Sequence, residues 1–349
     1  MLAQGETVSG TLTRYRTSPR PCRHVSLVPI GENERVKSDE TVADIGEFAL
    51  IERVSAGAGT SRFVLIGPGD DAAQVATKDG TFVVSTDLLV DGRHFRRDWS
   101  TAHDIGRKAA ACNLSDINAM GGVATALTVG LATPPGLPVA WAVDFSRGFE
   151  EECAVVGAHL VGGDVTESDT LMLAVTAMGD APRPVRRDGA LPGDVVAIAG
   201  RLGLAGAGYA ALSRGFRSPR QAVEAHRVPQ PPYAAGPQAA AAGATSMTDV
   251  SDGLVADAGH LAAASGVAID LWTEAFVVHE AVETVGGALG IDPLRFVLTG
   301  GDDYALVATF SAQTSLPDGW AQIGLVADGS GVTVDGKEYE GAGGHEHFR

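Results

Sequence analysis

Acidic residues follow apolar, strand-like stretches of the sequence at five places, each time beside glycine or a small hydroxyl residue. These places are Gly69-Asp70-Asp71, Ser85-Thr86-Asp87, Gly163-Asp164, Asp249-Val250-Ser251-Asp252-Gly253 and Gly300-Gly301-Asp302-Asp303-Tyr304, and Asp116 adds an acid on a predicted helix. A single pair of this kind is most simply a turn or a helix cap. Five of them would gather carboxylates at strand ends, where they repel one another unless cations lie between them. Such oxygen ligands suit Mg²⁺, which also bridges substrate phosphates.

The common phosphate-binding motifs do not explain this pattern. Residues 331–337 begin like a P-loop, but Glu338 stands where Ser or Thr should bind the metal, and Asp335-Gly336 is typical of a hairpin turn. Residues 67–72 imitate a dinucleotide-binding loop, yet two carboxylates would face the pyrophosphate. The glycines of residues 203–208 have the wrong spacing and predict a close-packed turn into a helix.

The sequence contains no motif typical of an activated nucleophile with its base. Cys112 and Cys153 fall on the core faces of predicted helices, where a buried thiol is expected. His94 differs, because it lies in a loop after a strand that carries Asp87. A lone loop histidine is usually only solvated, but the nearby acids make His94 a candidate for contact with a substrate.

The elements that must position these residues alternate between strands and helices. The predicted strands are 62–66, 81–85, 126–131, 171–177, the one beginning at Asp194, 295–298 and 305–310. The predicted helices lie around 45–51, from an N-cap at Asp104 to Met120, over 149–160, and from about Ser251. This alternation predicts an α/β fold.

The chain is expected to comprise an arm and two domains. Residues 1–40 show no apolar periodicity and predict a disordered arm, or an upstream start that adds nothing to the fold. The basic, proline-bearing stretch from Pro182 to Pro192 suggests a junction between an N-terminal α/β domain at 41–182 and a C-terminal α/β domain at 183–349. Both have an ordinary domain size.

Composition excludes several classes of protein. The 26 basic and 43 acidic residues leave a net charge of −17, which argues against a nucleic-acid partner. The apolar stretches are far shorter than the roughly 20 residues that span a bilayer, so no membrane partner is expected. Cys22, Cys112 and Cys153 build neither a disulfide framework nor a zinc motif, which predicts a cytoplasmic protein.

Six motifs of the chain resemble, in the same order, those of the thiamine-monophosphate kinase family. They occupy residues 66–72, 85–95, 113–122, 162–164, 249–254 and 300–304, and the resemblance covers residues 45–348. It implies ATP-dependent conversion of thiamine monophosphate to thiamine diphosphate, with ATP as co-substrate and several Mg²⁺ ions. It also implies the two-domain fold of the aminoimidazole ribonucleotide synthetase superfamily, in which the N-terminal sheets of two subunits pair in a homodimer.

The resemblance assigns three kinds of site residue by motif position. The implied metal ligands are Asp71, Ser85, Thr86, Asp87, Asp116, Asp164, Asp249 and Asp252. The implied ATP-binding residues are Gly163, Asp164, Arg187 and Ser251, and the implied substrate-binding residues are His94, Asp302 and Phe348. The chain departs from the family at Ala305, where a glutamate is usual, and so lacks one carboxylate beside the substrate loop.

The implied reaction needs no nucleophilic side chain and no general base. A phosphate monoester has a second pKa of about 6, so its attacking oxygen is already ionised near neutral pH. Each close pair of phosphate anions costs several kcal/mol at an effective dielectric of about 20, which divalent ions would offset. Transfer then depends on in-line positioning and charge neutralisation. The alternatives are another ATP-dependent synthetase of the same superfamily and a non-catalytic acidic module that binds metal or nucleotide.

Overall fold

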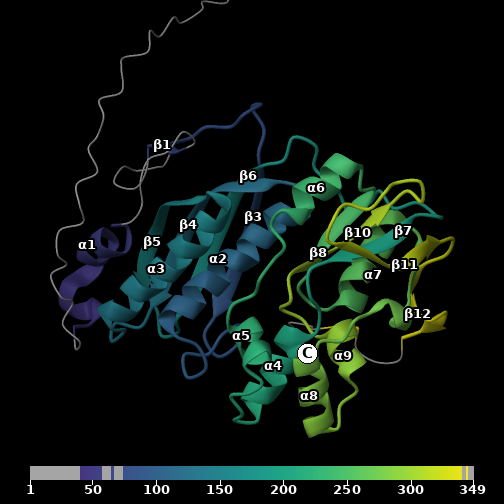
Figure 1. Ribbon diagram of the computed structural model, residues 1–349. Helices are drawn as coiled ribbons and strands as arrows, with labels where there is room; N and C mark the ends of the chain where they lie inside the picture. The colour runs from purple at the N-terminus through teal and green to yellow at the C-terminus, as the bar shows by residue number, and fades with distance from the viewer. Residues whose placement is uncertain (1–39, 57–63, 67–73, 340–342, 345–349) are drawn as a thin grey trace, which may run out of the picture. The chain divides into compact units, whose positions relative to one another are not determined.

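Residues 40–56, 64–66, 74–339 and 343–344 are described by a computed structural model, in which helices and strands alternate (Figure 1). The helices are α1 (Val42–Val54), α2 (Ala102–Ala119), α3 (Val139–Val156), α4 (Leu204–Ser213), α5 (Arg220–Arg227), α6 (Ala235–Ala242), α7 (Leu254–Ser265), the 3₁₀ helix η1 (Thr273–Ala275), α8 (Glu280–Leu289) and α9 (Pro293–Thr299). The strands are β1 (Val64–Ile66), β2 (Gln74–Val75), β3 (Val83–Val90), β4 (Val123–Thr133), β5 (His159–Glu167), β6 (Met172–Asp180), β7 (Val195–Ala199), β8 (Ser246–Val250), β9 (Ala268–Leu271), β10 (Ala305–Phe310), β11 (Trp320–Ala327), β12 (Gly331–Val334) and β13 (Lys337–Glu338). The predicted α/β class is confirmed.

Strands β3 to β6 form a four-stranded sheet with helices α2 and α3 on one face (Figure 1). The strand order is β3-β6-β4-β5, antiparallel except for the parallel pair β4 and β5. This order makes β3 an edge strand, so that Asp87 lies at the side of the sheet. Helix α2 is buried along most of its length because it packs against both the sheet and α3.

The start of α2 is set by a reciprocal pair of hydrogen bonds. The Thr101 hydroxyl accepts from the Asp104 backbone N–H, and the Asp104 carboxylate accepts from the Thr101 backbone N–H, each at 3.1 Å. This capping box satisfies two backbone donors that a helix start would otherwise leave unpaired. Thr101 is therefore the N-cap, and the prediction of Asp104 in that role is wrong by one turn.

The second sheet has seven strands in the order β13-β12-β9-β11-β7-β10-β8. Its pairs are antiparallel except for β12 with β9. One apolar cluster joins this sheet to α7 through residues such as Val250, Leu261 and Ile269, and another joins it to α6 through Met247 and Phe310. The sheet is thus covered on both faces.

The predicted turn at residues 335–336 is confirmed, since both residues have positive φ values and lie between β12 and β13.

Two predicted elements differ from the structure. The helix predicted over 149–160 is α3, which ends at Gly157 in a left-handed cap, and Leu160 belongs to β5. The strand predicted at 295–298 lies in α9, whose first residue is Pro293 and whose start is capped by the Asp292 carboxylate. By periodicity, a short apolar run fits a buried strand and a buried helix equally well. At residues 295–298 the helix forms because Asp292 and Pro293 provide a helix start.

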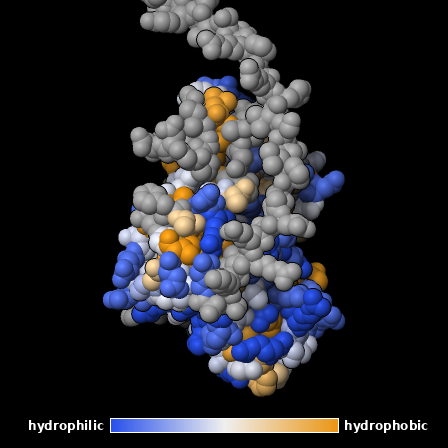
Figure 2. Space-filling model, turned by 90° about the vertical axis from the view of Figure 1, so that its left-hand side faces the viewer, coloured by the Kyte–Doolittle hydropathy of each residue, from blue (hydrophilic) through white to orange (hydrophobic). Residues whose placement is uncertain are grey.

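Several predictions fall outside the described residues or stay untested. Of the predicted arm at 1–40, only Glu40 is described. The predicted domain boundary at residue 182 lies between β6 and β7 and stays a prediction. The described residues visible in Figure 2 are mainly hydrophilic, with scattered apolar groups. In the described part of the chain, no helix combines the length and the apolar character needed to cross a membrane.

Candidate active site

Three acids from distant parts of the sequence come within electrostatic range of one another. Asp87 lies in β3, Asp116 in the last turn of α2 and Asp249 in β8. The Ser85 hydroxyl donates a hydrogen bond to Asp116 Oδ2 at 2.6 Å, and the Ser115 hydroxyl donates one to Asp249 Oδ2 at 2.7 Å. These two bonds connect the first sheet, α2 and the second sheet at one point.

The end of α2 is held in this position by Asn118. Its side-chain amide donates to the Pro232 carbonyl at 3.2 Å, and its Oδ1 accepts from the Gly236 backbone N–H at 3.0 Å. A Cβ at Gly236 would lie only 2.8 Å from the Asn118 carbonyl carbon, so only glycine permits this approach between α2 and α6. The packing therefore brings Ser115 and Asp116 to the end of β8.

The three acids form a crowded set of oxygen donors. Burial is the main reason that the pKa of Asp116 lies well above its usual range, and the charges of Asp249 and Asp87 raise it further. The Ser85 hydrogen bond and the charge of Arg187 act in the opposite direction but are smaller effects. Burial likewise raises the pKa of Asp249. Carboxylates with raised pKa values are stabilised in their ionised form by a nearby cation. Asp87, Asp116 and Asp249 therefore offer the hard oxygen donors that Mg²⁺ prefers. Among the described residues, the acids whose donor atoms lie within 4.8 Å of one another are Asp252 and Asp257, together with His260.

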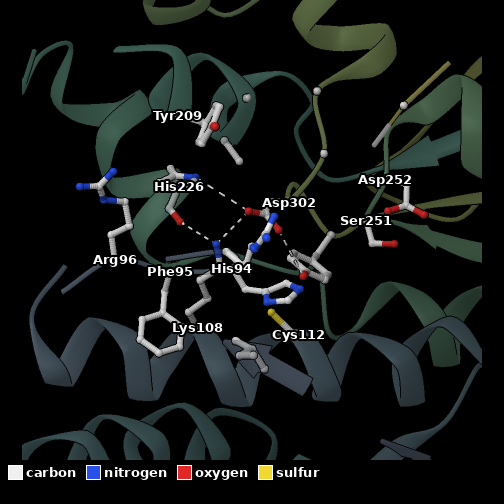
Figure 3. Close-up of a pocket in the computed structure, with 18 of the residues that line it drawn as sticks. His94, Phe95, Arg96, Lys108, Cys112, Tyr209, His226, Ser251, Asp252 and Asp302 are labelled. Atoms are coloured by element: carbon white, nitrogen blue, oxygen red, sulfur yellow. Dashed lines mark hydrogen bonds and ion pairs between the residues drawn. The ribbon is translucent and has the colours of Figure 1, made fainter. Parts of the chain in front are cut away.

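A second group forms around Asp302, in the loop between α9 and β10 (Figure 3). Lys108 Nζ of α2 donates to Asp302 Oδ2 at 2.8 Å, and His226 Nδ1 of α5 lies 3.8 Å from the same oxygen. Burial opposes ionisation of Asp302, but the charge of Lys108 and the Lys108 hydrogen bond lower the pKa of Asp302 below the ordinary value. Asp302 is therefore a carboxylate at neutral pH.

The loop that carries Asp302 has a constrained backbone. Asp302 and Tyr304 have φ values of 65° and 52°, in the left-handed region that residues other than glycine seldom adopt. Their backbone N–H groups donate to the carbonyls of Ser251 at 2.8 Å and Val250 at 2.9 Å, and the Asp303 carboxylate caps the N-terminus of α4. The end of β8 and the start of α4 thus hold the loop in one conformation, as is common at functional sites.

Members of both groups line one cavity of about 1670 Å³, although Asp249 and Ser85 are not among its lining residues. Asp87 and Asp116 of the first group and His94, Lys108 and Asp302 of the second are among its lining residues. Pockets for one drug-sized ligand hold about 300–1,000 Å³. This cavity therefore has room for two substrates at once.

The other predicted site residues are only partly brought together. Thr86, Ser251 and Asp252 also line the cavity, and Arg187 is close enough to Asp116 to lower its pKa. The Thr86 hydroxyl lies 2.9 Å from that of Thr176 in β6.

Gly163 and Asp164 lie apart from these residues. Both are in β5, at the edge of the sheet opposite β3. Three strand spacings of about 4.8 Å separate the two edges, or about 14 Å. Asp71 and Phe348 lie outside the described residues.

The cavity contains residues that the sequence analysis did not select. They include the aromatic cluster of Trp99, Tyr209 and His226, whose ring centroids lie 5.7 to 5.9 Å apart, and Lys108. The three rings come from a loop, α4 and α5, and no sequence pattern connects them. Lys108 could have been selected from the sequence. It precedes Cys112 and Asp116 by four and eight residues, so it shares their face of the helix.

The predicted absence of an activated thiol agrees with the structure for two of the three cysteines. Cys112 and Cys153 are free and buried, and burial raises the pKa of each thiol well above its usual value. A protonated, buried thiol is a poor nucleophile. Both are therefore structural, although Cys112 borders the cavity.

Two family models and many known proteins match the chain. The model described as "AIR synthase related protein, N-terminal domain" matches residues 69–181, and the corresponding C-terminal domain model matches residues 192–337. A thiamine-monophosphate kinase of Mycobacterium tuberculosis is 48% identical over 312 residues, which cover 88% of this chain and 93% of that protein. One from Corynebacterium glutamicum is 37% identical and covers 87% of this chain and 94% of that protein.

A solved structure described as AaThiL complexed with AMPPCP and TMP has a similar fold. It is 32% identical, with a TM-score of 0.74, and the match covers 87% of this chain and 98% of that one. The regions matched by the family models include both sheets and most of the residues that line the cavity. The chain belongs to the thiamine-monophosphate kinase family.

Proposed function

We propose that this protein transfers the γ-phosphoryl group of ATP to the phosphate of thiamine monophosphate, which yields thiamine diphosphate and ADP. The observation that carries the proposal is the single cavity in which a crowded acidic group and the Asp302 group face the same space. A site of this kind accommodates a metal-bound nucleotide beside a second, organic substrate. The family relatives named above support the choice of this reaction.

The site residues divide between the two substrates. We infer that Asp87, Asp116, Asp249 and Ser85 hold Mg²⁺ ions, together with Asp71, Thr86 and Asp252 of the predicted set. Asp164, the remaining predicted ligand, lies at the opposite edge of the sheet and so would hold a different ion from Asp87. When bound, the ions neutralise phosphate charge and align the phosphates for transfer. Gly163, Asp164, Arg187 and Ser251 are proposed to hold the nucleotide, and His94, Asp302 and Phe348 the thiamine phosphate. The acceptor oxygen is ionised on its own, so these side chains orient the reactants and transfer no proton.

The reaction is tested by measuring ADP release while both substrates are varied. We expect ADP only when thiamine monophosphate is present, with intersecting initial-rate lines, because direct transfer requires both substrates in the cavity together. Incubation with γ-labelled ATP alone should leave the protein unlabelled. A different superfamily synthetase would release ADP with another acceptor, and a binding module would release none. Parallel lines or stable label would exclude direct transfer.

We also propose a homodimer formed through the outer face of the first sheet. Helices α2 and α3 cover one face. On the other face, within the described residues, Val64 and Val75 of β1 and β2 pack against Ala126 and Met178, while Phe82, Val84 and Leu88 at the β3 edge are more than half exposed. Exposed apolar side chains on one sheet face are typical of an interface. The sheet pairing that the family resemblance implies points the same way.

Light scattering at micromolar concentration should report about twice the chain mass of 35.8 kDa. Val84→Asp should shift the protein to monomer, because a carboxylate would lose its water at the interface. Val277→Asp is the matched control, since Val277 is 98% exposed in the segment before α8 and should leave the mass unchanged. A wild-type protein that is monomeric and active would contradict the proposal.

We also infer a cytoplasmic location from the cysteines. Cys112 and Cys153 are free thiols, as expected in a reducing compartment.

A further inference from the structure

We infer that Lys108 is a positioning residue for substrate binding: its buried ammonium group holds one oxygen of Asp302, so that the other oxygen is presented to the cavity. This inference rests on the proposed function and concerns the acceptor side of the same site. It assigns a role to a residue that the family motifs did not select.

The contacts of Lys108 are those of a buried, directed cation. Only 3% of the residue is exposed, and its Nζ donates to Asp302 Oδ2 at 2.8 Å and to the His226 carbonyl at 3.3 Å. The Asp302 side chain is 36% exposed and lines the cavity. Its second oxygen, Oδ1, lies 3.5 Å from the Tyr304 hydroxyl, the limit of a hydrogen bond. Asp302 is thus anchored strongly through Oδ2 and weakly through Oδ1.

The ammonium group, and not the neighbouring imidazole, supplies the charge. His226 Nδ1 is 3.8 Å from Asp302 Oδ2, which is too long for a hydrogen bond. Burial and the nearby charge of Lys108 lower the pKa of His226 to about 3, so the ring is neutral at physiological pH. His226 contributes its backbone carbonyl to Lys108, which fixes the ammonium from a second side.

The position of Asp302 needs such an anchor because its backbone alone does not determine the side chain. The left-handed conformation of Asp302 sets where the side chain leaves the loop, but χ angles remain free to rotate. A charge-assisted hydrogen bond to a helix removes that freedom. Because α2 also carries Asp116, one rigid helix connects the metal-binding acids to the acceptor-binding loop. Lys108 thereby fixes the acceptor relative to the γ-phosphate.

Steady-state rates of Lys108→Met, with each substrate varied in turn, test this inference. Methionine keeps most of the volume of lysine but cannot donate to Asp302. We expect the KM for thiamine monophosphate to rise by about tenfold or more, the loss expected for a hydrogen bond to a charged group. The KM for ATP should hardly change, and kcat should fall less than the KM for thiamine monophosphate rises. If Lys108→Met does not fold, Lys108→Gln is the second variant. It removes the charge but keeps a neutral donor, so the same KM should rise by a smaller factor.

Arg107→Met is the matched control. Arg107 is the preceding residue of α2, and its guanidinium pairs with the buried Glu152 of α3 at 2.8 Å, away from the cavity lining. Its loss removes an ion pair from the same helix, so we expect reduced stability and an unchanged KM for thiamine monophosphate. Equal KM changes in Arg107→Met and Lys108→Met would show a structural effect only and would overturn the inference.

A double-mutant cycle with Asp302→Asn identifies the route of the effect. If Lys108 acts through Asp302, the double variant should have about the same KM for thiamine monophosphate as Asp302→Asn alone. If the KM of the double variant rises by the product of the two single-variant increases, Lys108 acts independently of Asp302, and the inference is overturned. Failure of the proposed function is seen separately, because the wild-type protein would then release no ADP with thiamine monophosphate. A wild-type enzyme that is active, with a Lys108→Met variant of normal KM, would refute the role of Lys108 alone.

Discussion

Asp116→Asn and Asp87→Asn should each lower turnover by more than about a hundredfold, as the removal of one charge-stabilising group from an active site commonly does. Asp116 accepts the Ser85 hydrogen bond and lies within range of both Asp87 and Asp249. Each of these acids is placed to hold a cation that offsets phosphate charge. Without one of them, part of that charge stays uncompensated during transfer. Rates of ADP release at several Mg²⁺ concentrations measure the effect.

The same substitutions should leave the fold intact. Asparagine has nearly the shape of aspartate, and at position 116 it can still accept from the Ser85 hydroxyl. Each substitution also removes one negative charge from a group in which charges repel. Circular dichroism and thermal unfolding should therefore match the wild-type protein or show a more stable one. Asp104→Asn is the control on the same helix, because this acid belongs to the cap at the opposite end and should keep its activity. Near-normal rates of Asp116→Asn at saturating Mg²⁺ would remove Asp116 from the site.

Gly106→Ala and Gly148→Ala should both destabilise the protein strongly, by about 3 kcal/mol or more, at the upper end for an overpacked core. The two glycines lie where α2 and α3 touch. A Cβ at Gly106 would be 2.8 Å from the Phe149 backbone nitrogen, and one at Gly148 would be 2.8 Å from the His103 carbonyl carbon. Backbone atoms of a packed helix cannot move aside as a flexible side chain can. Urea unfolding of the metal-free protein measures the change.

Gly287→Ala separates this effect from helix propensity. Gly287 is also a helical glycine, in α8, but a Cβ there would have no atom within 4 Å. Alanine is about 0.8–1.0 kcal/mol more favourable than glycine inside a helix, so this variant should be more stable than wild type. Activity should fall in the α2 and α3 variants, because α2 carries Lys108, Ser115 and Asp116. Equal unfolding midpoints for all three variants would show that α2 and α3 do not pack this closely.

The sequence by itself determined the class of the fold, the family and the chemistry. Acids beside glycines at strand ends indicated metal and phosphate, and the order of six motifs indicated the family. The α/β alternation, helix α2 and the turn at residues 335–336 were also predictable. These features depend on local patterns, such as hydrophobic periodicity, capping and turn residues, which act between neighbours in the chain.

Only the tertiary structure decided which of these residues meet. Asp116 and Asp249 come into range of each other because Ser115 and Asn118 dock the end of α2 against the second sheet and α6. Lys108 reaches Asp302 across 194 positions of sequence. The prediction of a strand at residues 295–298, which form part of α9, was wrong for a related reason. A run this short is too short to show a helical or strand periodicity. Contacts between distant segments depend on how whole elements pack and on the few glycines and caps that let them approach, and no local pattern carries that information.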